Sequence, residues 1–135
     1  MPANTSPIFP LTPNVSWGAV ATANTAKDGT GTVVTVFTAG ANGARLDYLK
    51  VRALGTNVAT VLRVFVNNCS TNATAANNTL ILDQTIAATT NSETAQLADN
   101  LIQLDLSLPA GYKINVTVGT TVAAGLQVTG VGGDY

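Results

Sequence analysis

The acidic side chains are the first residues of this sequence that could do chemistry, because the chain contains no histidine. Without an imidazole, it lacks the most common general base, metal ligand and triad partner. Catalysis by a carboxylate pair needs two acids that converge on one cleft. We therefore expect no catalytic residues and predict that the protein is not an enzyme. The candidate acids are spread singly along the chain: Asp28, Asp47, Asp83, Glu93, Asp99, Asp105 and Asp134.

The same acids do not predict a metal site. A calcium site needs several oxygen ligands within a short stretch, and residues 98–100 supply a single acid. Glycines cluster at residues 29–31 and 130–133, but no helix or lysine of a phosphate-binding loop follows them. We expect these glycines to form turns, and we predict neither a metal nor a cofactor.

Two polar features are better explained by contacts than by catalysis. Arg45 and Asp47 are two residues apart, so they share one face of a strand and could pair with each other or with a partner chain. The asparagine-rich residues 67–79 form either a flexible connection or an exposed recognition loop. Asn68 and Asn72 match glycosylation sequons by chance, because Asn and Thr are so frequent here. These four residues are secondary candidates for interaction.

The composition argues against several classes of ligand. Hydrophobic residues make up 46% of the chain and charged residues 10%, against a usual charged share of about 25%. With a net charge of -1 and no basic stripe, nucleic acid is not an expected ligand. No apolar run approaches the roughly 20 residues that span a membrane. A nearly neutral chain has little repulsion between copies, which suits a subunit of an assembly.

The cysteine content and the first residues indicate where the protein is made. Cys69 is the single cysteine, so no intrachain disulfide forms, and we expect a buried or unreactive thiol. Pro7, Pro10 and Pro13 interrupt the apolar residues near the N-terminus, which also lacks the basic region of a signal peptide. Synthesis and residence in a cytoplasm are therefore expected.

About eight short strands are predicted to position these residues. Segments rich in Val, Thr, Ile and Leu alternate in polarity between Gly, Asn and Asp. A change of apolar face predicts a bulge or bend near Tyr48 and Leu49. We expect an all-β, eight-stranded antiparallel β-sandwich of jelly-roll type, with an immunoglobulin-like sandwich as the alternative. The expected strands cover residues 17–26, 30–38, 44–54, 58–67, 79–87, 100–108, 112–118 and 122–131.

Residues 1–16 are expected to form an extended arm before a single domain at residues 17–135. Four of the five prolines lie in this arm, where they favour extended backbone and remove hydrogen-bond donors. Fully extended, its roughly fifteen residues span about 45 to 50 Å, so the arm could cross a neighbouring subunit or fold back over its own sandwich. The expected apolar anchors of the arm are Pro7, Ile8, Phe9, Pro10, Leu11 and Trp17.

The chain resembles the capsid decoration (cement) proteins of tailed double-stranded DNA bacteriophages. The resemblance rests on the Pro-rich arm, the absence of histidine, the strands in TGTVVTVFTAG, ARLDYLKVRAL and NLIQLDLSLPAGYKINVTVG, and the end GVGGDY. It implies a β-sandwich on the exterior of an icosahedral capsid, made in the host cytoplasm, that clamps adjacent major capsid subunits. The major capsid protein would be its partner, and the copies would form a symmetric homo-oligomer on the shell. The alternatives are a head-fibre or host-surface module that binds a glycan, and a cellular adhesin or pilus-like subunit.

Overall fold

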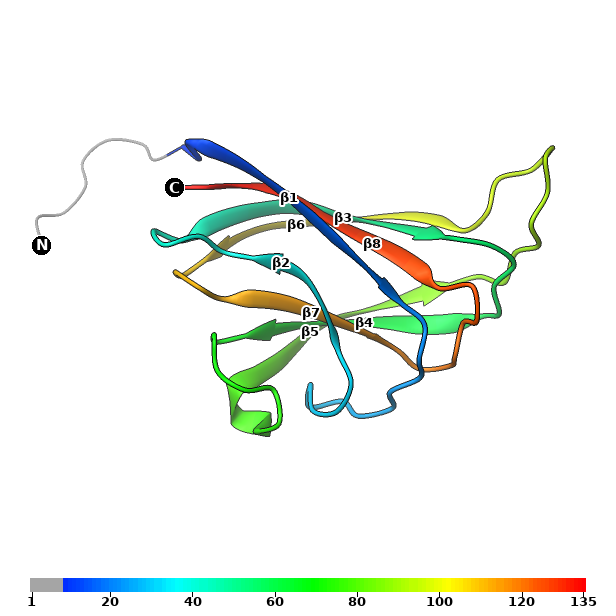
Figure 1. Ribbon diagram of the computed structural model, residues 1–135, viewed down its shortest axis with the longest axis horizontal. Helices are drawn as coiled ribbons and strands as arrows, with labels where there is room; N and C mark the ends of the chain where they lie inside the picture. The colour runs from blue at the N-terminus through cyan, green and yellow to red at the C-terminus, as the bar shows by residue number, and fades with distance from the viewer. Residues whose placement is uncertain (1–8) are drawn as a thin grey trace, which may run out of the picture.

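The computed structural model describes residues 9–135, and the expected all-β architecture is confirmed. Eight strands form two four-stranded sheets that face each other (Figure 1), and every pairing between these strands is antiparallel. The first sheet has the order β1-β8-β3-β6 and the second the order β2-β7-β4-β5. The elements are β1 (Thr12–Val20), β2 (Val34–Thr38), β3 (Ala44–Ala53), β4 (Thr60–Asn67), the short 3-10 helix η1 (Ala75–Asn77), β5 (Asn78–Ile86), β6 (Asp99–Leu108), β7 (Lys113–Val118) and β8 (Leu126–Asp134).

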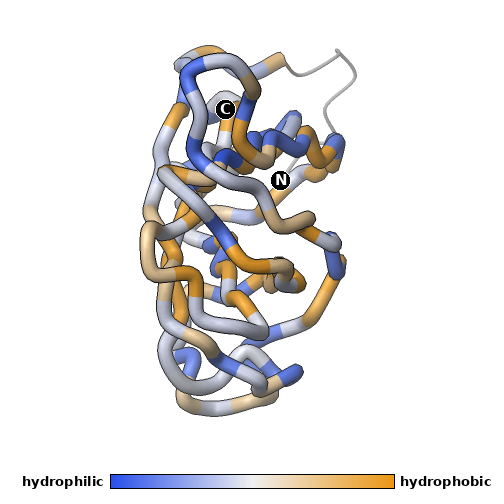
Figure 2. The backbone as a smooth tube through the Cα atoms, turned by 90° about the vertical axis from the view of Figure 1, so that its right-hand side faces the viewer, coloured by the Kyte–Doolittle hydropathy of each residue, from blue (hydrophilic) through white to orange (hydrophobic). Residues whose placement is uncertain are grey.

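The core lies between the two sheets and is built by alternation along the strands. Each strand sends every second side chain inward, so hydrophobic and hydrophilic residues follow each other closely along the chain (Figure 2). Burial of these apolar side chains supplies the main driving force for folding. Fully buried members of the core include Phe37, Leu46, Leu49, Leu62, Val64, Ile114, Val116 and Leu126.

The change of face in β3 is confirmed, and a bulge at Asp47 produces it. Leu46 and Leu49 are both 0% exposed although they are three positions apart, which a regular strand does not allow. The register of β3 with both of its neighbours shifts between Leu46 and Tyr48. On the β6 side, Asp105 adopts a left-handed conformation with φ 48. Two bulges therefore meet at the same level of the first sheet.

The glycines at residues 130–133 lie inside β8, so their prediction as a turn was wrong. This strand runs from Leu126 to Asp134 rather than over the expected residues 122–131. A Cβ atom on Gly132 would clash with the carbonyl oxygen of Arg45, and one on Gly130 would lie 3.1 Å from Phe37. Glycine is needed here because other chain segments approach the strand closely, which the sequence pattern does not reveal.

The first strand begins at Thr12 rather than at the expected Trp17, so residues 12–16 belong to the sheet and not to an arm. They pair with β8 from Thr12 opposite Asp134 onward. Pro13 fits this position because β1 is an edge strand with one partner in its sheet. Of the remaining arm, Pro7 and Ile8 lie outside the described residues.

Candidate interaction surface

The outer side of the first sheet carries large apolar side chains that face solvent. The even-numbered residues of β1 turn toward the second sheet, where Ser16 Oγ donates to the carbonyl of Val36 at 2.7 Å and Asn14 Nδ2 to that of Thr38 at 2.9 Å. Because side chains alternate along a strand, the odd-numbered residues point outward. Val15 is 51% exposed and Trp17 is 64% exposed.

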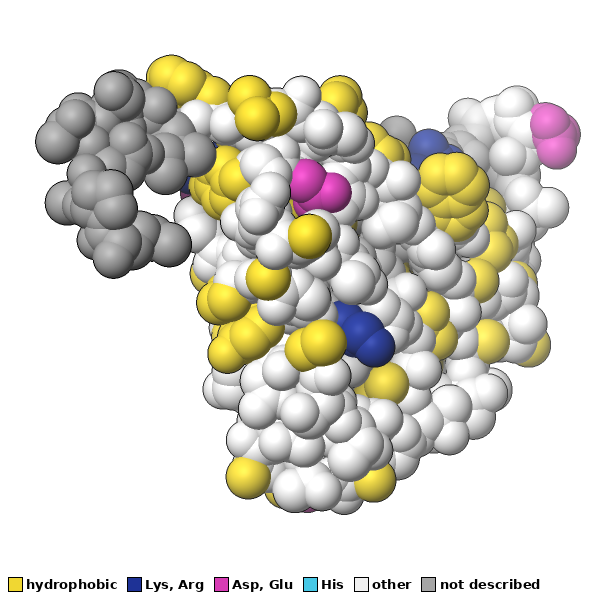
Figure 3. All heavy atoms as spheres, turned by 60° about the vertical axis from the view of Figure 1, so that its left-hand side comes forward, with side chains coloured by type: hydrophobic (Ala, Val, Ile, Leu, Met, Phe, Trp, Pro, Cys, Tyr) yellow, Lys and Arg dark blue, Asp and Glu magenta, His cyan; other side chains and the backbone are white. Residues whose placement is uncertain are grey.

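The strand register extends this apolar surface across the whole sheet. Val15 lies opposite Val131, which lies opposite Tyr48. In the next row, Trp17 lies opposite Thr129, which lies opposite Lys50. Lys50 in turn lies opposite Leu101, which is 58% exposed. Figure 3 shows hydrophobic side chains along the upper margin of the molecule, the side on which the first sheet lies in Figure 1. We call this surface the apolar face and define it by Val15, Trp17, Tyr48, Leu101 and Val131.

Two open hollows lie on the outer side of the first sheet. The larger, of 570 Å³, lies over β3, β6 and β8, and Tyr48, Leu101 and Val131 line it. The smaller lies at the end where β1 begins, between Pro10, Leu11 and Pro13 on one side and Asp47 on the other. Phe9 and Leu11 are 72% and 84% exposed. Pro13 lies on the same outward side of β1 as Val15, so the smaller hollow adjoins the apolar face.

The charged side chains around the apolar face are paired within the chain. Arg45 contacts Asp47 at 3.1 Å and Asp105 at 3.3 Å, so its partners lie at the double bulge. At the opposite end, Lys50 lies 2.6 Å from Asp99. Exposed pairs of this kind add only about 0–1 kcal/mol each to stability. These pairs matter more for binding than for stability, because they leave little unpaired charge that would have to be desolvated when a partner covers the surface.

The outer side of the second sheet differs, because the connection at residues 67–79 folds back over it. Asn72 Nδ2 donates to the carbonyls of Gly29 at 3.2 Å and Gly31 at 2.8 Å. The backbone N–H of Asn68 donates to the carbonyl of Asn77 at 3.0 Å. Phe65 points away from the main core, yet it is 0% exposed. Asn68 and Asn72 thus stabilise a folded loop that lies away from the apolar face.

Two single residues complete the comparison with the sequence. Asp28 is a turn residue as expected: hydrogen bonds from the Thr30 hydroxyl at 2.6 Å and from the Thr30 backbone N–H at 3.1 Å lower its pKa. Cys69 is exposed, so of the expected buried or unreactive thiol the first alternative is wrong. It follows Asn68 with a positive φ of 74, in a turn that the sequence pattern did not indicate.

The residues of the apolar face that the sequence missed are Val15, Tyr48, Leu101 and Val131. One signal was available, since Leu101 interrupts the polar positions of a strand whose other apolar residues alternate. Within residues 9–135, no three potential metal ligands cluster together. In the same part of the chain, no helix has the length and apolarity needed to cross a membrane.

Comparisons of the chain with protein-family models, curated proteins and solved structures find no match. The structure by itself defines an all-β protein of two sheets, with the apolar face exposed to solvent.

Proposed function

We propose that this protein is a capsid decoration protein of a tailed bacteriophage. On this proposal it binds the outer surface of an icosahedral shell and stabilises the shell by clamping adjacent major capsid subunits. The observation that carries the proposal is the apolar face, which the exposed Leu11 and the hollow at Pro10 and Pro13 adjoin. A contiguous exposed apolar surface of this kind marks an interaction site.

We further propose that the sandwich is a jelly roll. The strand order supports this, because the pairs are nested: β1 with β8, β2 with β7, β3 with β6 and β4 with β5. Such nesting arises when one long antiparallel ribbon wraps into two sheets, as in the jelly rolls of viral capsid domains. A fold alone does not assign a function, so the proposal depends on the surface.

The energetics of the surface suit a clamp. Covering the exposed side chains of Val15, Trp17 and Leu101 removes apolar area from water. The paired charges at Arg45 and Lys50 lower the cost of bringing this surface against a partner. Proline at position 10, just before β1, reduces the freedom that the preceding chain loses on docking. A ligand that binds only the expanded lattice stabilises that lattice by mass action, and many linked copies add their effects.

Co-sedimentation with expanded, undecorated shells, assembled from the major capsid protein of the same genome, tests the proposal. The full chain is expected to bind saturably. Trp17→Ser is expected to weaken binding at least about tenfold, because buried tryptophans are frequent hot spots. The matched control is Val58→Ser, which alters a side chain that is 49% exposed in the connection after β3 and outside the apolar face.

A second variant tests the arm. Deletion of residues 2–9 leaves β1 intact, because the strand begins at Thr12, and we expect it to weaken binding while the domain stays folded. If the full chain does not pellet with the shells, the decoration proposal is wrong. If Trp17→Ser and Val58→Ser bind equally well, the apolar face is not the contact surface.

A head-fibre or host-surface module that binds a glycan is the second candidate function. It is favoured by a polar hollow on the second sheet, lined by Asn67, Lys113 and Asn115. Such a module would still bind its glycan after deletion of residues 2–9, whereas a clamp would bind capsid shells more weakly.

A further inference from the structure

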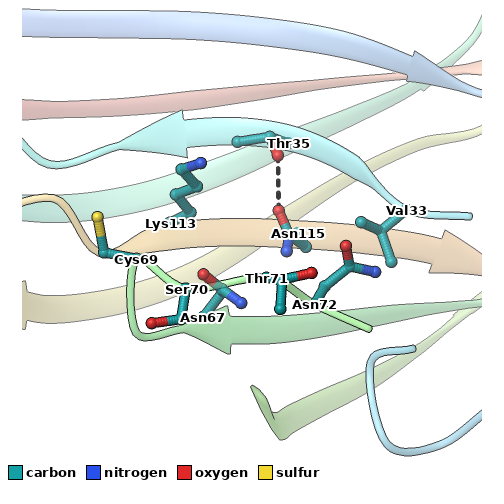
Figure 4. Close-up of a pocket in the computed structure, with 9 residues that line it drawn as sticks. All are labelled: Val33, Thr35, Asn67, Cys69, Ser70, Thr71, Asn72, Lys113 and Asn115. Carbon is teal, nitrogen blue, oxygen red and sulfur yellow. Dashed lines mark hydrogen bonds between the residues drawn. The ribbon is translucent and has the colours of Figure 1, made fainter. Parts of the chain in front are cut away.

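A polar hollow of 240 Å³ lies on the outer side of the second sheet, away from the apolar face. Strands β2, β4 and β7, the residue before β2 and the connection after β4 contribute its side chains (Figure 4). It is smaller than the roughly 300–1,000 Å³ of pockets for drug-sized ligands, so it suits a ligand the size of one sugar ring. Its lining is Val33, Thr35, Asn67, Cys69, Ser70, Thr71, Asn72, Lys113 and Asn115.

Asn67 brings a buried acceptor without a partner to this hollow. The residue is 1% exposed, and its Nδ2 donates to Asn78 Oδ1 at 2.8 Å. This bond fixes the orientation of the amide, and Oδ1 then receives no hydrogen bond from the described residues. Buried polar atoms of native proteins are nearly always satisfied by protein or water, so Asn67 Oδ1 calls for a donor that residues 9–135 do not supply.

Asn115 and Lys113, on the same face of β7, supply hydrogen-bond donors to the hollow. Asn115 is 3% exposed, and its Oδ1 accepts from Thr35 Oγ1 at 2.7 Å (Figure 4). No acceptor within residues 9–135 takes a hydrogen bond from its Nδ2. Lys113 lies directly opposite Asn67 in the register of β4 and β7, and it forms no ion pair with any described residue. No carboxylate lines the hollow to neutralise this ammonium.

Together these groups are complementary to one kind of ligand. A hydroxyl of the ligand would donate to Asn67 Oδ1, an oxygen would accept from Asn115 Nδ2, and a carboxylate would lie against the Lys113 ammonium. The lining holds no aromatic ring, so binding would depend on hydrogen bonds and charge rather than on stacking. We propose that this hollow binds a hydroxylated carboxylate, the chemistry of an acidic sugar. The proposal is independent of capsid binding.

Amide NMR titration of the full chain tests the proposal with three probes: methyl β-D-glucuronide, free D-glucuronate and neutral methyl β-D-glucoside. We expect the glucuronide to shift the amides of Asn67, Lys113 and Asn115, with a Kd on the order of 1 mM. The glucoside lacks the carboxylate and is expected to bind at least about tenfold more weakly. If the glucuronide binds and free glucuronate does not, the ligand is the end of a glycan. If both bind, the free acid is a ligand as well. Either result supports the proposal.

Lys113→Gln is expected to remove the difference between glucuronide and glucoside. Its matched control is Lys27→Gln, which alters an exposed lysine that does not line the hollow. Unchanged amide positions elsewhere in the spectrum establish that Lys113→Gln remains folded. The single thiol gives a second readout, because Cys69 lines the hollow and is exposed; bound glucuronide is expected to slow its alkylation by iodoacetamide.

Three outcomes overturn the proposal. The first is the absence of shifts at Asn67, Lys113 and Asn115 up to about 50 mM glucuronide, a concentration that detects even weak sites. The second is equal binding of glucuronide and glucoside. The third is an unchanged preference for glucuronide in Lys113→Gln. None of these outcomes depends on the result of co-sedimentation with capsid shells.

Discussion

Single asparagines hold together segments that are far apart in this chain. Asn57, which is 4% exposed, donates through Nδ2 to the carbonyls of Ala87 at 2.8 Å and Val58 at 3.1 Å. Its Oδ1 accepts from the backbone N–H and the hydroxyl of Thr89. The connection between β3 and β4 is thereby tied to the segment that follows β5. This amide satisfies backbone groups that no strand satisfies.

Replacing Asn57 by alanine is expected to lower the free energy of unfolding by about 2–3 kcal/mol, because several buried partners lose their hydrogen bonds at once. Urea unfolding followed by far-UV circular dichroism measures the change. Asn42→Ala is the matched control, since Asn42 is exposed in a turn and should change stability by less than about 0.5 kcal/mol. Equal stability of the two variants would show that the Asn57 hydrogen bonds contribute no net stability.

Asparagine also limits what the sequence can predict at this scale. Residues 67–79 were consistent with either a flexible connection or a recognition loop, because asparagine stabilises turns and also recognises ligands. The structure gives Asn72 partners at Gly29 and Gly31, about forty positions away in the sequence. Local pattern does not reveal partners at that distance.

At the scale of the strand, alternation predicted most elements but not their irregularities. The bulge in β3 was predictable, because its buried positions change phase between Leu46 and Leu49. The bulge in β6 was not, because Leu104 and Leu106 continue the alternation past it while Asp105 takes up the left-handed conformation. The start of β1 was missed because Pro13 was interpreted as part of an arm. An edge strand tolerates that proline.

Asp105→Val is expected to destabilise the protein by about 1–2 kcal/mol, since a β-branched residue at φ 48 is strained. Asp105→Asn is the control, because asparagine tolerates this conformation and loses only the exposed contact with Arg45. Thermal unfolding compares the two variants with the wild type. If valine is tolerated as well as asparagine, the left-handed conformation at Asp105 is not a constraint on β6.

At the scale of the whole molecule, the two outer sides differ. The first sheet leaves its apolar face bare, while the second is partly covered by residues 67–79 and carries a polar hollow. The sequence predicted eight strands in two sheets, because alternation shows which side of each strand is buried. It did not predict which strands are neighbours. The pairing of β1 with β8, for example, joins opposite ends of the described chain.

Binding to capsid shells through the apolar face is expected to depend little on salt. The charges around that face are paired within the chain, and the net charge is -1, so screening removes little attraction. Co-sedimentation between about 50 and 500 mM NaCl should change the Kd by less than about twofold. A tenfold loss of affinity over this range would indicate contact through charged groups, contrary to the proposed surface.

The connection between β5 and β6 projects from the end of the sandwich opposite to that at which Thr12 pairs with Asp134 (Figure 1). All of residues 90–96 are exposed in it. Exposed loop tips of this kind tolerate insertions. A peptide epitope inserted beside Glu93 would therefore be carried away from the arm end of the molecule, and the sandwich would serve as a display scaffold in which cargo and docking are spatially separated.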